Sequence, residues 1–172
     1  MEFKDSVKEC ISSLCKRGIK VVLVTGRMNA AAVKIAQDLG LNTPVISYQG
    51  GLVVENGKKL YERYLTEEQA ERVLSWAREE KIHINLYNND VLYTEKDCYE
   101  IQRYCNNLHT EHTVKNFSEI KKDKVNKLLA IDFSSSERID KLEKEKKDIS
   151  IKFFSDFSPI KLNAKIIINE II

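Results

Sequence analysis

The order of secondary structure predicted for residues 3–48 is the feature that most constrains the fold. The first helix is indicated by apolar side chains that recur with helical period, namely Val7, Cys10, Ile11, Leu14 and Cys15. A β-branched run follows at 19–24, then an Ala-rich helical segment at 29–39 and a second short strand at 45–47. The order is therefore α-β-α-β. This order is typical of a right-handed doubly wound parallel sheet and predicts an α/β fold.

The first predicted strand, 19–24, is apolar on both faces apart from Lys20. Strands of this kind lie in the middle of a parallel sheet, where helices cover both faces, so we expect a central strand here. The strand ends at Thr25-Gly26-Arg27. Because open parallel sheets bind ligands beyond the carboxyl ends of their strands, this tripeptide is the first candidate for a site.

The chemistry of the tripeptide suits a small anion. The Thr25 hydroxyl can donate to an anionic oxygen, Gly26 lets the backbone come close, and Arg27 adds a positively charged fork. The helix that follows would direct its N–H groups and its positive dipole at the same place. From the residues alone two interpretations stay open, a phosphate site and a plain turn, and a Thr-Gly pair after a strand is more often a turn.

A second part of the chain begins after a break at residues 50–51. Asn56-Gly57 between two apolar runs is a strong hairpin signal. Beyond it, residues 65–155 predict the order αββ-α-βαβ, which is an α+β module inserted after the α/β unit. We therefore expect four parts: a partial α/β core at 1–51, a hairpin and hinge at 52–64, the α+β module at 65–157, and a divergent strand-like tail at 158–172.

Local signals support the elements of the α+β module. Capping boxes are predicted at Thr66 and again at Asp97, each followed by an amphipathic helix. Strands are predicted at 82–86, 91–93, 128–133 and 149–154, with a charged helix from residue 134 to about 146.

The composition limits the classes of partner. The 28 Lys and Arg residues nearly balance the 26 Asp and Glu residues, so the formal charge is 28 − 26 = +2. A nucleic-acid surface usually shows a strong basic excess, and we therefore expect none. The four cysteines lack the close C-x-x-C spacing of zinc sites and are interpreted as reduced, mostly packed thiols. No apolar run approaches the length of a membrane helix, so we expect no membrane partner and a cytoplasmic location.

Both ends of the chain look incomplete for a whole domain. The chain starts almost directly in a helix and stops in the Ile-rich run 166–172. An uncovered β-prone end of this kind promotes association, because strand edges pair readily with other chains. We therefore expect a truncated domain, whose uncovered sheet edge would allow self-association.

Two runs of the sequence, 16–27 and 39–51, resemble the Cof-type branch of the haloacid dehalogenase superfamily of phosphatases. The resemblance extends through the Asn56-Gly57 hairpin and the α+β module, which looks like that branch's cap domain, and covers about residues 4–155. It implies an α/β core with an inserted cap. It also implies hydrolysis of small phosphomonoesters, such as sugar phosphates, through an aspartyl-phosphate with Mg²⁺.

The resemblance assigns roles to five residues. Thr25 takes the position of the family threonine that holds the substrate phosphate, with Gly26 and Arg27 beside it. Gln49 and Gly50 take the position of an Asn-Gly or Gln-Gly pair at the entry to the cap, near the active-site cleft. We therefore expect these five residues to bind a small phosphorylated metabolite.

Three motifs of the family are missing from this sequence: the Asp-x-Asp-Gly-Thr stretch with the nucleophile and the acid/base, the later Lys-Gly, and the Gly-Asp-x-x-Asn-Asp metal motif. Asp132 and Asp156 follow apolar runs, but neither has the second aspartate or the Gly-Thr. Lys161 and Lys165 precede no glycine and receive no role. Without a nucleophilic carboxylate and ligands for Mg²⁺, we expect no metal site and no activity from this chain alone.

Other candidates and other functions carry less weight. His109 and His112 are interpreted as solvated loop residues, and His83 as a residue on the outer face of a strand. Tyr87, Tyr93 and Tyr99 could line a cap face toward a sugar, although ordinary packing is the simpler interpretation. Two alternatives to a phosphatase fragment stay open: a non-catalytic module that binds a phosphorylated metabolite, and the product of a degraded reading frame.

Overall fold

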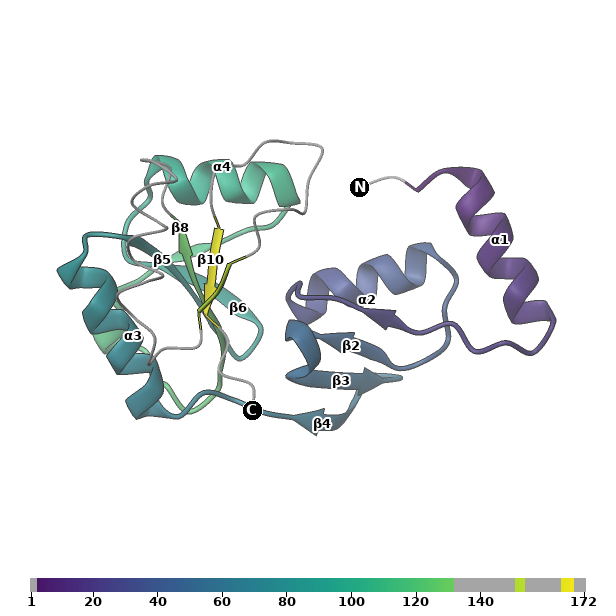
Figure 1. The fold of residues 1–172 in the computed structure, drawn as a ribbon, viewed down its shortest axis with the longest axis horizontal. Helices are drawn as coiled ribbons and strands as arrows, with labels where there is room; N and C mark the ends of the chain where they lie inside the picture. The colour runs from purple at the N-terminus through teal and green to yellow at the C-terminus, as the bar shows by residue number, and fades with distance from the viewer. Residues whose placement is uncertain (1–2, 132–150, 154–164, 169–172) are drawn as a thin grey trace. The chain divides into compact units, whose positions relative to one another are not determined.

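The computed structural model describes residues 3–131, 151–153 and 165–168. The chain divides into two compact units, Met1–Arg63 and Tyr64–Ile172, called the N-terminal and the C-terminal unit below (Figure 1). None of the described helices is long and apolar enough to cross a membrane. Residues 132, 156 and 161, the predicted helix from residue 134 and most of the predicted tail lie outside the described residues.

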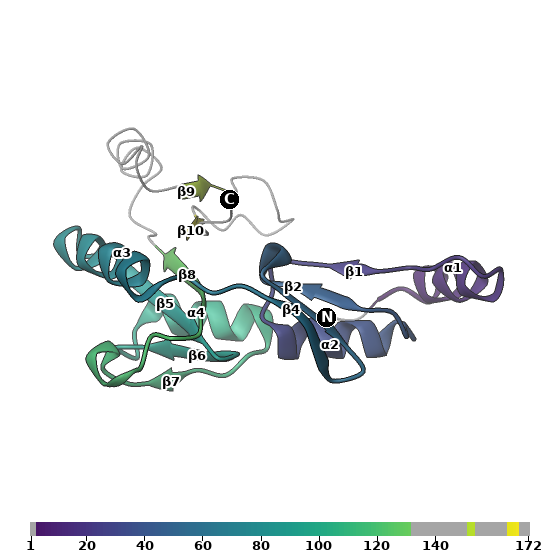
Figure 2. The ribbon, with the colours of Figure 1, turned by 90° about the horizontal axis from the view of Figure 1, so that it is seen from below.

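The N-terminal unit has two helices and a sheet of order β1-β2-β3-β4 (Figure 2). Its elements are α1 (Asp5–Lys16), β1 (Leu23–Val24), α2 (Asn29–Asp38), β2 (Val45–Ser47), the 3₁₀ turn Tyr48–Gly50, β3 (Leu52–Glu55) and β4 (Lys58–Glu62). Strands β1 and β2 are parallel, and the hairpin β3–β4 continues the sheet antiparallel to β2. The predicted α-β-α-β order and the α/β fold class are confirmed.

The core of the N-terminal unit lies between α2 and the sheet. Ala32 and Ala36 of α2, Leu41 and Val45 are buried and form one cluster. The small alanines let the helix lie close to the strands. No residue of α1 is buried, although Ile11 packs against the cluster.

The expectation of a central strand at 19–24 is wrong. The strand is shorter, because only Leu23 and Val24 pair with β2, and it lies at the edge of the described sheet. Val22 is 43% exposed and Val24 is 63% exposed. The run is apolar as predicted, but among the described residues no strand pairs with its outer edge, and Val22 and Val24 stay exposed.

The described residues of the C-terminal unit form two helices and a sheet of order β7-β6-β5-β8-β10-β9. Its elements are α3 (Glu67–Glu79), β5 (His83–Asn88), β6 (Val91–Thr94), α4 (Tyr99–Leu108), β7 (Thr113–Val114), the 3₁₀ turn Phe117–Glu119, β8 (Val125–Ile131), β9 (Ile151–Phe153) and β10 (Lys165–Ile168). Strand β10 lies between β8 and β9, so the Ile-rich segment is paired on both sides over these residues and is not an uncovered edge there.

Strand β5 separates two layers of side chains, because alternate residues of a strand point to opposite faces. Ile84 and Leu86 join the main core with the buried face of α3, which includes Leu74 and Trp76. On the other face, His83 contacts Cys98 and Tyr87 hydrogen-bonds Tyr104, which places α4 against that side.

The helix starts of the C-terminal unit differ from each other. At α3 the predicted capping box is present: Thr66 N–H donates to Gln69 Oε1 at 2.8 Å and Gln69 N–H donates to Thr66 Oγ1 at 3.2 Å. At α4 the predicted box is wrong. Cys98, not Asp97, is the residue before the helix, and it is Gln102 that donates to the Asp97 carboxylate.

The α3 capping box gives a first testable expectation. Thr66→Ala should lower the free energy of unfolding of the C-terminal unit by about 1 kcal/mol, because an N–H group at the helix start loses its acceptor. Urea unfolding followed by the fluorescence of Trp76, the single tryptophan of the chain, measures this change. The exposed Thr113→Ala is the matched control. An equal loss in both variants would contradict the role of the cap.

Candidate phosphate-binding site

The loops that follow the parallel strands β1 and β2 are held together by backbone hydrogen bonds. Thr25 N–H donates to Ile46 O at 2.9 Å, Gln49 N–H to Thr25 O at 3.1 Å, and Tyr48 N–H to Arg27 O at 3.0 Å. In the first loop, Arg27 N–H lies 3.3 Å from Thr25 Oγ1 and turns the chain back on itself. The five residues predicted for the site therefore meet at the carboxyl edge of the parallel pair.

Gly26 and Gln49 are in direct contact. A Cβ atom added at Gly26 would lie 3.1 Å from Gln49 Cγ and 3.3 Å from its Nε2. Such distances are tighter than ordinary van der Waals contact, so the absence of a side chain at residue 26 is what lets the Gln49 amide lie over this loop. The close approach of the Gln49 side chain to the backbone therefore explains why residue 26 is a glycine.

The second loop has an uncommon backbone conformation. Tyr48 (φ 51°) and Gln49 (φ 57°) are both in the left-handed region, followed by Gly50 at φ 100°. Left-handed backbone at a residue other than glycine costs of order 1 kcal/mol and collects at functional sites. The buried ring of Tyr48, 1% exposed, anchors the loop in this conformation.

Two polar residues missed by the sequence analysis support the site. Ser47, at the end of β2, is fully buried, and its Oγ lies 3.5 Å from Asn29 Oδ1 and 3.3 Å from Leu52 O. Asn29 is the first residue of α2, so this contact ties the helix start to the end of β2. Ser47 could have been found from the sequence, because it is a polar residue at the end of an otherwise apolar strand.

The arrangement is suited to holding an anion. Thr25, Gly26, Arg27, Gln49 and Gly50 are all partly exposed, so a ligand can reach them. Arg27 supplies positive charge, and α2 begins two residues later, so its positive end lies next to the loop. Phosphoryl groups are recognised by this combination of a cation, hydroxyl and amide donors, and a helix start.

The family resemblance implies Mg²⁺, but the described residues do not form a cluster of ligands for it. They contain no group of three or more His, Cys, Asp or Glu side chains placed to hold a metal ion. The donors at the site, a hydroxyl, an amide and a guanidinium, suit an anion and not a hard cation, which prefers carboxylate oxygens. The described part of the candidate site is therefore suited to an anion.

The remaining polar candidates lie in the C-terminal unit. His83 is half-buried and contacts Cys98, so its predicted place on an outer strand face is wrong. His109 is exposed, as expected for a loop, whereas His112 is half-buried, with its Nε2 3.4 Å from Asp97 Oδ1. Of the four thiols only that of Cys105 is buried; Cys10 and Cys15 are exposed, which corrects the expectation of packed cysteines.

Comparison with known proteins identifies the family of the chain. The sequence profile of the haloacid dehalogenase-like hydrolases matches residues 2–169. The chain belongs to this family. The phosphatase YwpJ of Bacillus subtilis (strain 168) is 29% identical over 85 residues, which are 49% of this chain and 30% of that protein.

Solved structures agree with this assignment. TM0651 from Thermotoga maritima is 25% identical with a TM-score of 0.74, covering 99% of this chain and 64% of that one. The subclass IIB sugar phosphatase BT4131, at 13% identity and a TM-score of 0.72, shares the fold over 98% of this chain and 64% of its own. The chain spans less than two thirds of each of these three relatives.

Proposed function

We propose that residues 25–27 and 49–50 bind the phosphoryl group of a small phosphorylated metabolite, as the phosphate-holding part of a haloacid-dehalogenase-type phosphatase. The observation that carries this proposal is the joining of the Thr25–Arg27 loop to the Tyr48–Gly50 loop by backbone hydrogen bonds at the carboxyl edge of the parallel strands. Family membership supports phosphomonoester hydrolysis as the reaction of the whole enzyme.

The proposed substrate class is a sugar phosphate or another small phosphomonoester. A similar protein described as a sugar phosphatase supports this choice. In this proposal the α/β part at 1–51 holds the phosphate, residues 52–64 form the hinge, and the α+β part at 65–157 is the cap that selects the organic group of the substrate.

In this proposal the 172 residues alone bind phosphate but hydrolyse phosphoesters negligibly. Thr25, Arg27 and Gln49 hold and orient an anion, yet none of them is a carboxylate that could attack phosphorus or take a proton from water. Mg²⁺, which in the family neutralises the charge of the transferring group, lacks described ligands here. Phosphate binding without turnover is also what a non-catalytic binding module would show.

Thr25→Val tests the binding part of the proposal. The change keeps the shape of the side chain but removes the hydroxyl that donates to the anion. Losing a hydrogen bond to a charged group costs about 1.5–3 kcal/mol, so the affinity for inorganic phosphate should fall roughly 10- to 100-fold. Calorimetric titration measures it, with the exposed Thr113→Val as matched control. Unchanged binding in Thr25→Val would contradict the assignment.

Turnover is measured separately with p-nitrophenyl phosphate and Mg²⁺. Negligible release of p-nitrophenol from the pure chain is the expected result. Rapid, Mg²⁺-dependent release that Thr25→Val abolishes would show an active enzyme and refute the proposed inactivity. Binding without turnover, lost in Thr25→Val, fits both a phosphatase fragment and a binding module. A longer chain that contains the missing aspartate motif separates these two, because only the fragment gains activity from it.

A further inference from the structure

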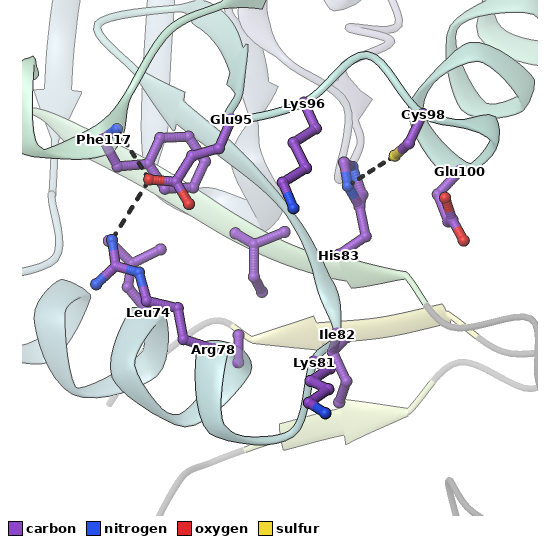
Figure 3. Close-up of a pocket in the computed structure, with 12 residues that line it drawn as sticks. Leu74, Arg78, Lys81, Ile82, His83, Glu95, Lys96, Cys98, Glu100 and Phe117 are labelled. Carbon is purple, nitrogen blue, oxygen red and sulfur yellow. Dashed lines mark hydrogen bonds and ion pairs between the residues drawn. The ribbon is translucent and has the colours of Figure 1, made fainter.

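The C-terminal unit contains a pocket of about 400 Å³ that is distinct from the phosphate-binding loops. It opens where β5 loses a neighbour: β5 pairs with β8 from His83 onward, but with β6 only from Leu86 onward. The chain between β6 and α4 passes the pocket and contributes Glu95, Lys96 and Cys98 to its lining (Figure 3).

Cys98, His83 and Asn85 are connected in a row at this pocket. Cys98 Sγ lies 3.2 Å from His83 Nδ1, and His83 Nε2 lies 2.7 Å from Asn85 Oδ1. Figure 3 shows Cys98 and His83 facing each other. An amide oxygen can only accept, so Nε2 carries the imidazole proton and Nδ1 presents its lone pair to the thiol. A nucleophile, a base and a third group that orients the base form the arrangement by which thiols are activated.

Burial keeps both members of the pair neutral. Burial of the imidazole is the largest cause of the lowered pKa of His83. The hydrogen bond to Asn85 and the negative charge of Glu100 act in the opposite direction and raise this pKa. Burial also raises the pKa of the Cys98 thiol, and the Glu100 side chain raises it further. Hydrogen bonds from the backbone N–H groups of Ile101 and Glu100 lower this pKa in part. At neutral pH the pair is therefore a thiol beside a free base, and the thiol needs that base to lose its proton.

Asn85 supports the pair at an energetic cost. Its side chain is fully buried, and its Nδ2 has no hydrogen-bond partner among the described residues. A buried donor without a partner costs about 1–3 kcal/mol. An apolar residue of similar size would avoid this cost, but it could not fix which nitrogen of His83 faces Cys98.

We propose that Cys98 is a nucleophilic thiol that forms a mixed disulfide with small disulfides entering this pocket, with His83 as its base and Asn85 as the residue that orients His83. His83 Nδ1 takes the proton of Cys98 Sγ, and the sulfur attacks one sulfur of the incoming disulfide, whose S–S bond breaks as the new one forms. The departing thiolate takes the proton from His83. Cys98 is oxidised, one half of the small disulfide is reduced, and one free thiol is released.

The charges around the pocket indicate which disulfides it accepts. Arg78 is paired with Glu95 at 3.5 Å, and the other charged residues of the lining are two cations, Lys81 and Lys96, and one anion, Glu100. Figure 3 shows Lys96 reaching into the pocket near His83. The proposed ligands are therefore disulfides that carry carboxylates, and the volume suits a molecule of a few amino-acid residues.

The other cysteines of the chain are internal controls. Cys105 has a comparable imidazole, with its Sγ 3.5 Å from His112 Nδ1, but it is buried. Cys10 and Cys15 on α1 are exposed, and the N-terminal unit contains no histidine. Access alone would favour Cys10 and Cys15, and an imidazole alone would favour Cys98 and Cys105 equally. Access and a base together favour Cys98.

The test is the rate at which each cysteine forms a mixed disulfide with oxidised glutathione, followed by peptide mapping and mass spectrometry. In the native protein Cys98 should react first, and unfolding in urea should remove its advantage over Cys10. His83→Ala should slow Cys98 roughly 100-fold, and added imidazole should restore part of the rate, which a merely structural role of His83 would not allow. His109→Ala, at the exposed histidine of the chain, is the matched control and should leave Cys98 unaffected.

Two results would overturn the proposal. The first is a native protein in which Cys98 reacts no faster than Cys10 and Cys15; this needs no variant, so it holds even if His83→Ala fails to fold. The second is a folded His83→Ala protein with an undiminished rate at Cys98. Phosphate binding by the N-terminal unit should be the same before and after modification of Cys98, which keeps this test independent of the proposed function.

Discussion

Leu86→Ala is expected to lower the free energy of unfolding of the C-terminal unit by about 2–5 kcal/mol. Leu86 lies in the middle of β5, is fully buried, and belongs to the cluster that joins the sheet to α3. Its cross-strand partners are Tyr93 on one side and Leu128 on the other. Because regular strands fix its surroundings on both sides, the cavity left by the substitution cannot collapse easily, and the cost should lie in the upper part of this range.

Urea unfolding followed by Trp76 fluorescence measures the loss, because Trp76 is 3% exposed in the same cluster. Leu60→Ala is the matched control: Leu60 is 52% exposed in β4, so its truncation removes little buried surface. The phosphate affinity of the N-terminal unit should stay the same in both variants. A loss below 1 kcal/mol in Leu86→Ala would show that the packing of β5 against α3 is not the main support of this unit.

Local patterns were enough to predict most helices and hairpins. The 3.6-residue repeat of apolar side chains located α1, and the Thr66 box located the start of α3 within one residue. Asn56-Gly57 located the β3–β4 hairpin. These signals work because the interactions behind them, namely capping, turn conformation and one buried face, involve residues close together in the sequence.

Properties that depend on distant neighbours were predicted poorly. The apolar run that ends at Val24 has the composition of a central strand. Its own residues do not determine whether strands pair with it on both sides, and in the described sheet β1 is an edge strand. His83 alternates with apolar residues as a surface residue would, yet α4 covers its face of the sheet and Cys98 contacts it. Alternation separates two faces of a strand without telling which of them meets solvent.

For the same reason, only part of the candidate site could be predicted from the sequence. Thr25-Gly26-Arg27 at a strand end could be found from sequence, because residue types and position in a parallel sheet were sufficient. The left-handed backbone of Tyr48 and Gln49, and the contact of Gln49 with Gly26, could not be found in this way. They arise from two loops that lie about twenty residues apart in the sequence and meet only in the folded sheet.

Gly26→Val is expected to lower the affinity for inorganic phosphate roughly 100-fold or more. The added Cβ would lie 3.1 Å from Gln49 Cγ, and the branched side chain would displace the Gln49 amide from the loop. Forcing a side chain into occupied space costs about 1–3 kcal/mol, and each hydrogen bond lost to a charged ligand about 1.5–3 kcal/mol more. Together these terms exceed the effect expected for Thr25→Val.

The contact between Gly26 and Gln49 also predicts that their substitutions are not additive. Adding Gln49→Ala to Gly26→Val removes the atoms that the valine strikes, so the double variant should recover roughly tenfold in phosphate affinity over Gly26→Val, within the range known for residues in contact. Gly57→Val is a control for glycine loss, because a Cβ there meets nothing within 4 Å, although its φ of 76° brings some strain to the hairpin. Calorimetric titration of the single and double variants measures the coupling. Strictly additive losses would mean that Gln49 does not hold the loop in its binding conformation, and that its amide acts on phosphate independently of Gly26.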